Sequence, residues 1–240
     1  MNVLILGYGK MGKIISEIAE QRGHTIAAKI NIENTHELQT IKPSEVDVAI
    51  EFSQPESAFG NISWCIERGI PVVSGTTGWL DKRVEVERLC KESNGTFFYA
   101  SNFSVGVNIF FKVNEFLAQL MKDQSGYRVS MEEVHHTEKK DAPIGTAITL
   151  AEGVVGQIGR LKEWVLQNDQ PIKDSQLPIT AKRIDPAPGT HIIRYQSAID
   201  DIEITHTAHS RRGFAEGAVL VGEWVKDKKG ILSMDDFLSF

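Results

Sequence analysis

Cysteine is scarce in this chain. Only Cys65 and Cys90 occur among the 240 residues, and each lies in a segment whose apolar residues recur at helical spacing. Isolated cysteines of this kind are usually small apolar residues in proteins of reducing compartments. We therefore expect buried or partly buried free thiols.

Long hydrophobic runs are also absent. No segment approaches the roughly 18 uninterrupted apolar residues that a membrane span needs. The apolar run near the start, Val3–Leu6, is far too short for a signal peptide. These absences predict a soluble, cytoplasmic protein without a membrane partner.

An excess of basic residues is the third absence. Lys and Arg number 26 against 32 Asp and Glu, so the formal net charge is −6. This balance argues against a nucleic-acid partner, because general nucleic-acid binders carry a basic surface. With 41% hydrophobic residues, the chain has enough apolar material for one large domain or two small ones.

The first hundred residues alternate between strand and helix signals. Repeated alternation with short connections implies a parallel sheet covered by helices on both faces. We therefore predict an N-terminal Rossmann-like α/β domain. Its predicted strands are 3–6, 25–30, 47–52, 71–74 and 96–100, and its helices begin near residue 11 and cover 55–68 and 79–91.

The pattern changes near Asn102. Alternating apolar and polar residues then become typical of antiparallel strands. We predict a C-terminal α+β domain with a mixed or antiparallel sheet over residues 103–211, and a dinucleotide-binding domain formed by 1–102 plus 212–240. The predicted elements are helices 107–121, 144–159 and 214–226, strands 127–135, 191–198 and 202–208, and a polar loop 165–190 with a short strand at 179–184.

A glycine-rich motif of the form G-x-G-x-x-G follows the first predicted strand and opens the first predicted helix. The first glycine permits a tight turn, the second lets the backbone approach a pyrophosphate, and the third lets helix and strand pack closely. Free N–H groups at the helix start attract phosphate. The motif predicts a bound dinucleotide, and its residues are Gly7, Tyr8, Gly9, Lys10, Met11 and Gly12.

The end of the second predicted strand normally carries an acidic residue that binds the adenine ribose. Asn31 stands there, with Glu33 two residues further on. An asparagine can bind a ribose hydroxyl without repelling a 2′-phosphate, and Lys10 could lie near such a phosphate. The choice between NADH and NADPH therefore stays open.

Two further loops follow predicted strands, at the sheet edge where ligands bind in such folds. Gly75-Thr76-Thr77-Gly78 offers close backbone approach and two hydroxyls to a nicotinamide amide or ribose. Ala100-Ser101-Asn102-Phe103 follows the next strand in the same way. Both are candidate cofactor contacts, and an ordinary strand–helix turn is the alternative for each.

The densest group of ionisable side chains lies between His135 and Lys140, where two imidazoles and two ammonium groups occupy six residues. Histidine titrates near neutral pH, so His135 or His136 can exchange protons during turnover, and Lys139 can add a charge and a proton donor. Adjacent strand residues point to opposite faces, so only one of the histidines readily shares a face with Glu133.

A turn and a helix follow this group. Pro143 keeps Ala142 extended, so residues 136–142 form a loop in our prediction, and a helix begins after it. The N–H groups of Gly145 and Thr146 would face outward at the helix start, where Thr146 adds a hydroxyl. That arrangement is typical of a carboxylate site.

Two other interpretations compete for these residues. His-His pairs and Lys-Lys runs are often solvated surface groups. His206 and His209 have an H-x-x-H spacing and could join His135 or His136 around a metal. Residues three apart on a strand face opposite ways, and no cysteine or carboxylate clusters with them in sequence, so we predict no metal site.

At these residues the chain resembles the 4-hydroxy-tetrahydrodipicolinate reductase family, of the diaminopimelate and lysine pathway. The resemblance covers nearly the whole chain, including the glycine motif, Gly75-Thr76-Thr77-Gly78 and residues 102–108. The His135 segment follows most of the family pattern E-x-H-H-x-x-K-x-D-A-P-S-G-T-A. The family fold is a Rossmann-like domain plus a mixed α/β domain that forms homotetramers through its sheet.

The resemblance implies NADH- or NADPH-dependent reduction of 4-hydroxy-tetrahydrodipicolinate, a small cyclic dicarboxylate, to tetrahydrodipicolinate. His135 matches the family's proton donor/acceptor, and Lys139 matches its proton-donating lysine. His136, Gly145 and Thr146 match substrate contacts. Residues 7–12, 75–77 and 100–103 match cofactor contacts.

Three departures from the family matter. Ile144 replaces the usual serine and removes one hydroxyl at the substrate carboxylate. Asn31 replaces the common acidic residue. The segment from Asn31 to Asp47 is shorter than in many members.

Two rival functions are considered. A related dehydrogenase of an aspartate-derived aldehyde is disfavoured by the His-His-x-x-Lys loop and by the lack of a nucleophilic cysteine in a predicted active-site loop. A non-catalytic NAD(P)-sensing regulator would bind the cofactor without turnover.

Overall fold

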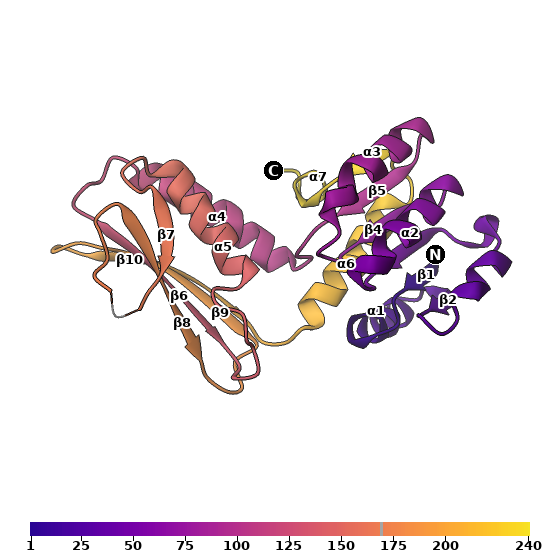
Figure 1. Cartoon of the computed structure of the whole chain (residues 1–240), viewed down its shortest axis with the longest axis horizontal. Helices are drawn as coiled ribbons and strands as arrows, with labels where there is room; N and C mark the ends of the chain where they lie inside the picture. The colour runs from indigo at the N-terminus through magenta and orange to yellow at the C-terminus, as the bar shows by residue number, and fades with distance from the viewer. Residues whose placement is uncertain (169) are drawn as a thin grey trace. The chain divides into compact units, whose positions relative to one another are not determined.

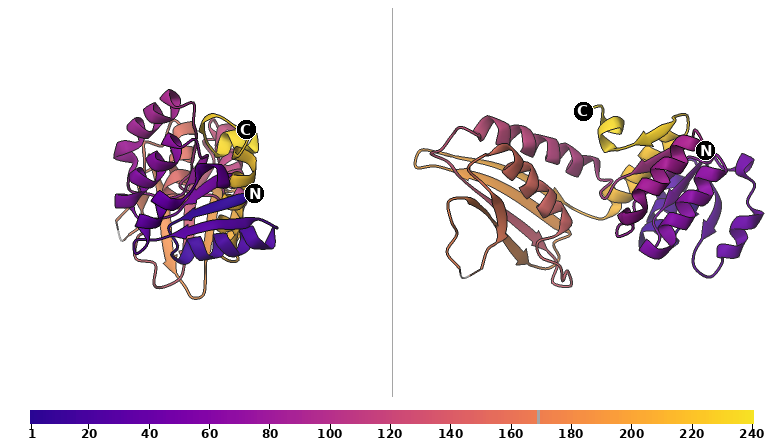
Figure 2. Two further views of the ribbon diagram at one scale, coloured as in Figure 1. Left: turned by 90° about the vertical axis from the view of Figure 1, so that its right-hand side faces the viewer. Right: turned by 45° about the horizontal axis from the view of Figure 1, so that its top comes forward.

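The computed structural model describes residues 1–168 and 170–240. The chain divides into two compact units, Met1–Val105 with Arg212–Phe240, and Gly106–Arg211. We call them unit 1 and unit 2. Each unit has its own sheet and its own hydrophobic core (Figures 1 and 2).

Unit 1 is built on a six-stranded sheet in the order β11-β5-β4-β3-β1-β2, and every strand pair is parallel. All four residues of the central strand β3 are buried, as expected for a parallel strand covered on both faces. The strands are β1 (Asn2–Leu6), β2 (Thr25–Ile30), β3 (Val48–Glu51), β4 (Val72–Ser74), β5 (Thr96–Tyr99) and β11 (Gly230–Leu232).

Helices cover both faces of this sheet, and the alternation within β1 shows how the two cores form. Val3 and Ile5 face the core built with α1 (Lys10–Gln21) and α6 (Arg212–Val225). Leu4 and Leu6 face the core built with α2 (Pro55–Glu67) and α3 (Arg83–Glu92). The shorter helices are η1 (Thr35–Thr40), η2 (Pro43–Glu45), η3 (Leu80–Lys82) and α7 (Met234–Leu238).

Unit 2 is built on a five-stranded mixed sheet in the order β10-β9-β6-β8-β7. Strand β9 is antiparallel to both β6 and β10, whereas β8 is parallel to both β6 and β7. Helices α4 (Val105–Met121) and α5 (Gly145–Gln157) cover one face of the sheet (Figure 1). The strands are β6 (Arg128–His135), β7 (Glu163–Leu166), β8 (Gln176–Arg183), β9 (Gly189–Gln196) and β10 (Asp201–Ala208).

The predicted fold class is confirmed, with a parallel sheet in the N-terminal region and a mixed sheet in the C-terminal part. The predicted loop 165–190 was wrong in part, because β7 and the longer β8 lie within or beside it. Strand β7 lies at the sheet edge with no fully buried residue, so it lacks the apolar alternation that marks a half-buried strand. Residue 169, in the same predicted loop, lies outside the described residues.

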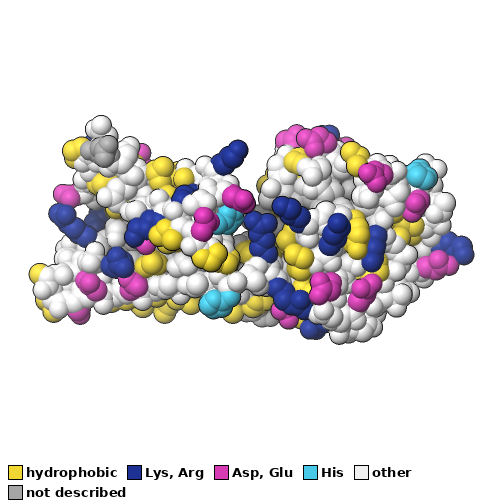
Figure 3. Space-filling view, turned by 90° about the horizontal axis from the view of Figure 1, so that it is seen from below, with side chains coloured by type: hydrophobic (Ala, Val, Ile, Leu, Met, Phe, Trp, Pro, Cys, Tyr) yellow, Lys and Arg dark blue, Asp and Glu magenta, His cyan; other side chains and the backbone are white. Residues whose placement is uncertain are grey.

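The surface carries charges of both signs. Figure 3 shows basic and acidic side chains interspersed on the face that it draws, with hydrophobic side chains between them. Across residues 1–168 and 170–240, the helices all lack the length and apolar character that crossing a membrane requires.

Candidate active site

The glycine motif joins β1 to α1 in unit 1. Gly7 has φ +95°, and a Cβ added there would lie 2.1 Å from the carbonyl oxygen of Phe52. A Cβ on Gly12 would lie 2.0 Å from the carbonyl oxygen of Gly7. A Cβ on Gly9 would meet no heavy atom within 4 Å. Packing therefore requires the first and third glycines, whereas the second faces open space that a pyrophosphate can approach, so this loop fits a dinucleotide.

Two cavities of about 390 and 360 Å³ adjoin this loop, and both are lined by Gly9, Phe52, Ser53 and Gln54. They lie at the carboxyl ends of β1 and β3, where the strand order β2-β1-β3 reverses direction. Ligands in open α/β sheets bind at such a switch point. The first cavity also takes in Lys10, Met11, Pro55, Gly75, Thr76 and Thr77, and the second takes in Gly7, Tyr8, Ile30, Asn31, Ile32, Glu33, Thr35, Ser57 and Asn61.

Asn31 lines the second cavity, but its side-chain oxygen is already engaged. That oxygen accepts the N–H of Glu33 at 2.8 Å and the N–H of Asn34 at 3.3 Å. Lys10 lines the first cavity instead, so it does not share the Asn31 cavity. Lys29 is a cation that the sequence analysis missed. Its Nζ lies 5.1 Å from the centre of the Tyr8 ring, and Tyr8 lines the Asn31 cavity.

The loop after β4 is held by a buried carboxylate. Glu51 is fully buried and accepts hydrogen bonds from the hydroxyls of Ser74 and Thr76, at 2.6 and 2.8 Å. The Thr76 hydroxyl also accepts the N–H of Ser53 at 2.8 Å. Thr76 therefore holds two loops together. Thr77 lines the first cavity and is exposed, so its hydroxyl is the more accessible of the two to a ligand.

The segment Ala100–Phe103 is placed differently. In the part of the chain that the structure describes, these residues line neither cavity. Phe103 is a core residue, and its ring centre lies 5.4 Å from that of Phe52. Since Phe52 lines both cavities, Phe103 contributes to them indirectly, by packing against the Phe52 ring.

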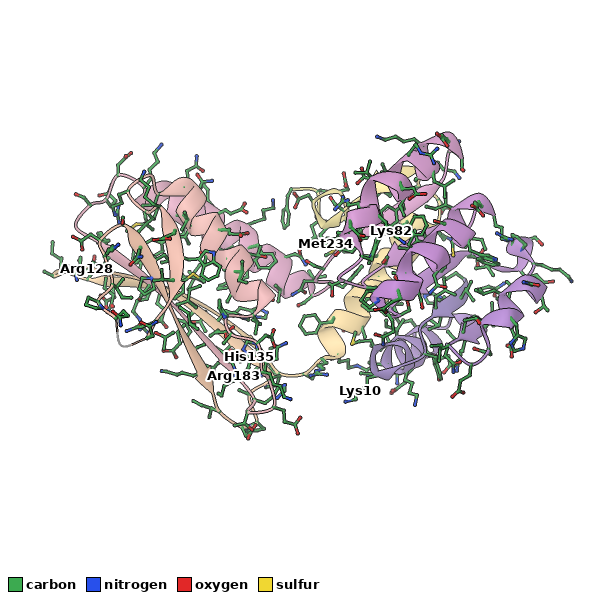
Figure 4. All side chains as sticks on the ribbon, in the orientation of Figure 1. Lys10, Lys82, Arg128, His135, Arg183 and Met234 are labelled. Carbon is green, nitrogen blue, oxygen red and sulfur yellow. The ribbon has the colours of Figure 1, made fainter. Side chains whose placement is uncertain are left out.

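In unit 2, neighbouring strands bring four polar side chains together at one end of the sheet. Glu133 and His135 alternate onto the buried face of β6. Glu133 is in register with His191 of β9, and His135 is in register with Arg183 of β8. Figure 4 shows His135 and Arg183 together at one end of this sheet and Arg128 at the other. Sequence analysis missed His191 and Arg183, because only strand register reveals them.

Glu133 is the centre of this group. It is fully buried, and its two oxygens have different partners. One accepts a hydrogen bond from Arg183 Nη2 at 3.0 Å. The other accepts the N–H of Ile144 at 3.2 Å and lies 3.7 Å from His135 Nδ1. One carboxylate thus links a strand, its neighbour and the start of α5.

Burial governs the protonation of the two histidines. It lowers the pKa of His135, and the neighbouring Glu133 charge only partly opposes this. It lowers the pKa of His191 to about 3, with His135 and His206 adding to the effect. The rings of His135 and His191 lie 5.3 Å apart, centre to centre, in an edge-to-face arrangement. Both histidines are therefore neutral near pH 7, and neutral His135 can accept a proton.

The loop after β6 carries the remaining charges. Lys139 Nζ forms an ion pair with Asp141 Oδ1 at 2.8 Å, and this contact lowers the pKa of Asp141. The Lys139 side chain is 35% exposed, so it is accessible to a ligand. The Thr137 hydroxyl donates to Asp185 at 2.6 Å, which ties the loop to the turn after β8. His136 is half-buried, next to this bond.

Gly145 and Thr146 are the first two residues of α5. N–H groups in the first turn of a helix have no partner within the helix, so they are available to an anion. Ile144 precedes them, and its own N–H is held by Glu133. The structure thus brings His135, Lys139 and the α5 start to one end of the unit 2 sheet. A base, an ammonium group and an anion site can there act on one small acid.

Glu133, His135 and His191 also place one possible metal-ligand atom each within 4.8 Å of one another. They are the one such group among the described residues, and neither His206 nor His209 belongs to it. The Glu133 charge is already paired with Arg183. The group therefore needs no cation to balance it.

Comparison with known proteins decides the family. The dihydrodipicolinate reductase N-terminus model matches residues 1–103, and the dihydrodipicolinate reductase C-terminus model matches residues 106–238. The chain belongs to the dihydrodipicolinate reductase family. A 4-hydroxy-tetrahydrodipicolinate reductase of Christiangramia forsetii is 52% identical over 241 residues, which is 100% of this chain and 98% of that protein. One of Neisseria meningitidis is 33% identical, over 90% of this chain and 81% of that protein.

The fold agrees with this family. A solved dipicolinate-bound dihydrodipicolinate reductase from Paenisporosarcina sp. TG-14 superposes with a TM-score of 0.78 at 20% identity, covering 99% of both chains. The predicted family, the α/β fold and the predicted reductase class are confirmed. The dihydrodipicolinate reductase family uses a pyridine nucleotide, so the chain is a nicotinamide-dependent oxidoreductase.

Proposed function

We propose that this chain reduces 4-hydroxy-tetrahydrodipicolinate to tetrahydrodipicolinate with NADH or NADPH, in the diaminopimelate route of lysine biosynthesis. The observation that carries the proposal is the 52% identity, over the full chain, to a protein named for this reaction. The glycine loop of unit 1 and the histidine–lysine loop of unit 2 supply the two groups of residues that the chemistry needs.

A bound dihydronicotinamide would supply the hydride. The 4-hydroxyl group of the substrate leaves as water, which creates a ring double bond conjugated with the imine, and this double bond is what the hydride reduces. The residues of this chain supply the proton that quenches the negative charge developing on the substrate ring during that reduction. Burial keeps His135 neutral, so we assign the donated proton to the ammonium group of Lys139, which is paired with Asp141. His135 takes up and returns protons between turnovers as general acid–base groups do.

The substrate is a cyclic dicarboxylate, and we assign its carboxylate to the start of α5. The N–H groups of Gly145 and Thr146 and the Thr146 hydroxyl hold the anion, Lys139 adds positive charge, and His136 adds a ring N–H donor. Ile144 lacks the hydroxyl usual in the family, and its backbone N–H donates to Glu133, so Ile144 holds the turn and offers the anion no hydrogen bond.

For the cofactor, we assign the pyrophosphate to Gly7–Gly12, the adenine ribose to Asn31 and the nicotinamide end to Gly75–Thr77. Residues Ala100, Ser101, Asn102 and Phe103 remain proposed contacts for the nicotinamide side. Asn31 carries no charge that would repel a 2′-phosphate, and Lys29 stands beside Tyr8, so use of both NADH and NADPH is expected.

We assign cofactor binding to residues 1–102 plus 212–240, and substrate binding and oligomerisation to 103–211. A homotetramer in the cytoplasm is the proposed working form. An exposed apolar stripe on α4 supports self-association, because such stripes mark contact surfaces. Its members are Ile109, Val113, Phe116 and Leu120, which are 44–62% exposed. Light scattering on the purified chain measures the assembly.

Loss of nicotinamide absorbance with 4-hydroxy-tetrahydrodipicolinate as substrate tests the activity. Lys139→Ala and His135→Ala should each cut turnover by roughly 10²-fold or more, the usual contribution of general acid–base groups. Lys140→Ala, one position further along the same loop, is the matched control and should keep wild-type turnover. Unchanged turnover in both test variants would refute the assigned roles.

A further inference from the structure

We propose that Arg183 is a positioning residue: its guanidinium, paired with Glu133, holds the loop 136–144 in the conformation that presents Lys139, His135 and the start of α5 together. The proposal deepens the proposed function and rests on the roles assigned there to His135 and Lys139. It concerns Arg183, which contributes none of the proposed proton transfers or anion contacts.

The contacts of the guanidinium carry the argument. Nε donates to the carbonyl oxygen of Lys139 at 2.9 Å. Nη2 donates to the carbonyl oxygen of Asp141 at 2.6 Å and to Glu133 Oε1 at 3.0 Å. A planar group with donors in a fixed fork can hold three acceptors in one geometry. Arg183 therefore fixes the backbone on both sides of Lys140, and with it the direction of the Lys139 side chain.

Glu133 holds the other end of the loop 136–144. Its other oxygen accepts the N–H of Ile144, which is the residue before α5, and faces His135 Nδ1. The carboxylate is fully buried, whereas the Arg183 side chain is 21% exposed. A buried carboxylate without its cation is strongly unfavourable, so Glu133 also fixes Arg183 in place. The pair thus links both ends of the loop to strands β6 and β8.

Strand register makes this contact specific. Arg183 is the last residue of β8 and lies directly beside His135, the last residue of β6. Lys182, one position earlier, points to the other face and pairs with Glu132 at 2.7 Å. Because side chains alternate along β8, Arg183 faces the loop and Lys182 faces away from it.

Arg183→Lys is the decisive variant. Lysine keeps the positive charge beside Glu133 but cannot reach the carboxylate and two carbonyl oxygens at once. We expect kcat to fall about 10- to 100-fold, because the proton donor is misplaced. The KM for the nucleotide should stay within twofold, since its assigned site lies in unit 1. Arg194→Lys, in the Arg194–Glu203 ion pair of the same sheet, is the matched control and should leave kcat unchanged.

Hydrogen–deuterium exchange on the purified chain without substrate separates this proposal from the proposed function. In Arg183→Lys, amides of residues 137–146 should exchange at least tenfold faster, while those of β9 keep wild-type protection. Wild-type exchange in these amides would overturn the positioning role, whether kcat falls or not. Faster exchange with unchanged kcat would do so too, because the loop would then be held without being needed. If Lys139→Ala and His135→Ala retain turnover, the proposed function fails whatever the exchange shows.

Discussion

His191 shows how a single, almost fully buried residue can shape the candidate site. It is 5% exposed, and its Nε2 has no hydrogen-bond partner among the described residues. Burial lowers its pKa to about 3, so its ring stays neutral next to His135. A charged ring there would add positive charge beside His135 and lower the basicity of that residue further. His191 thus places an uncharged ring beside His135, the proposed acid–base residue.

This burial predicts a loss of stability in acid. Between pH 6.5 and about 3, the unfolded chain binds a proton at His191 that the folded chain excludes. The free energy of unfolding therefore falls as pH falls through this window, by up to about 1.4 kcal/mol per pH unit from this group. Urea unfolding at pH 7, 6 and 5 should show a shallower slope for His191→Gln than for wild type. His36→Gln, at an exposed position, is the control and should keep the wild-type slope. Equal slopes in all three proteins would contradict the prediction.

At the scale of an element, the strand–turn–helix β1-loop-α1 needs its glycines for different reasons. Gly12 lies inside α1, where glycine is normally unfavourable, but a Cβ there would collide with the carbonyl oxygen of Gly7. Gly9 precedes the helix with φ −83°, which any residue can adopt, and has space around it. Packing explains Gly12, whereas only a ligand explains Gly9.

Alanine substitutions should therefore separate stability from binding. Gly12→Ala should lower the free energy of unfolding by about 1–3 kcal/mol, the usual cost of overpacking. Gly9→Ala should leave the melting temperature within a degree or so of wild type but raise the KM for the nucleotide about tenfold, equivalent to about 1.4 kcal/mol of binding. Thermal unfolding and initial rates on both variants test this. A normal KM in Gly9→Ala would mean that the pyrophosphate lies elsewhere.

At the scale of the whole molecule, unit 1 is assembled from two separate stretches of chain. The chain leaves unit 1 after Val105 and returns at Arg212 to form α6. A Cβ on Gly217 of α6 would lie 1.8 Å from the carbonyl oxygen of Phe103, so the returning helix packs tightly on the departing segment. The residues around the glycine loop thus belong to a unit whose folding needs both stretches.

Cofactor binding should therefore stabilise the molecule by mass action. A nucleotide at 100 times its Kd adds about 2.7 kcal/mol to the free energy of unfolding of the form that binds it. NADH and NADPH should both raise the melting temperature. Lys29→Ala should reduce the shift caused by NADPH more than the shift caused by NADH, because Lys29 stands beside the Asn31 cavity. Lys13→Ala, exposed on α1, is the control. An equal loss with both nucleotides would remove Lys29 from cofactor choice.

The sequence by itself determined the alternating α/β order, the glycine loop, the family and the residues of the His135 segment, because each depends on local pattern or on adjacent residues. It also showed that Glu133 and one histidine share a strand face, since side-chain direction alternates along a strand. The short edge strand β7 escaped it, and so did the division of the predicted cofactor contacts between two cavities, because neither leaves a local pattern.

Only the tertiary structure decided that Arg183 and His191 flank Glu133 and His135. The four residues come from β6, β8 and β9, and their meeting depends on strand register, which is set by packing across the whole sheet. The same holds for Thr76, whose hydroxyl is taken by Glu51, a residue 25 positions away. Local sequence specifies which chemical groups are present, and long-range packing specifies which of them are free to act.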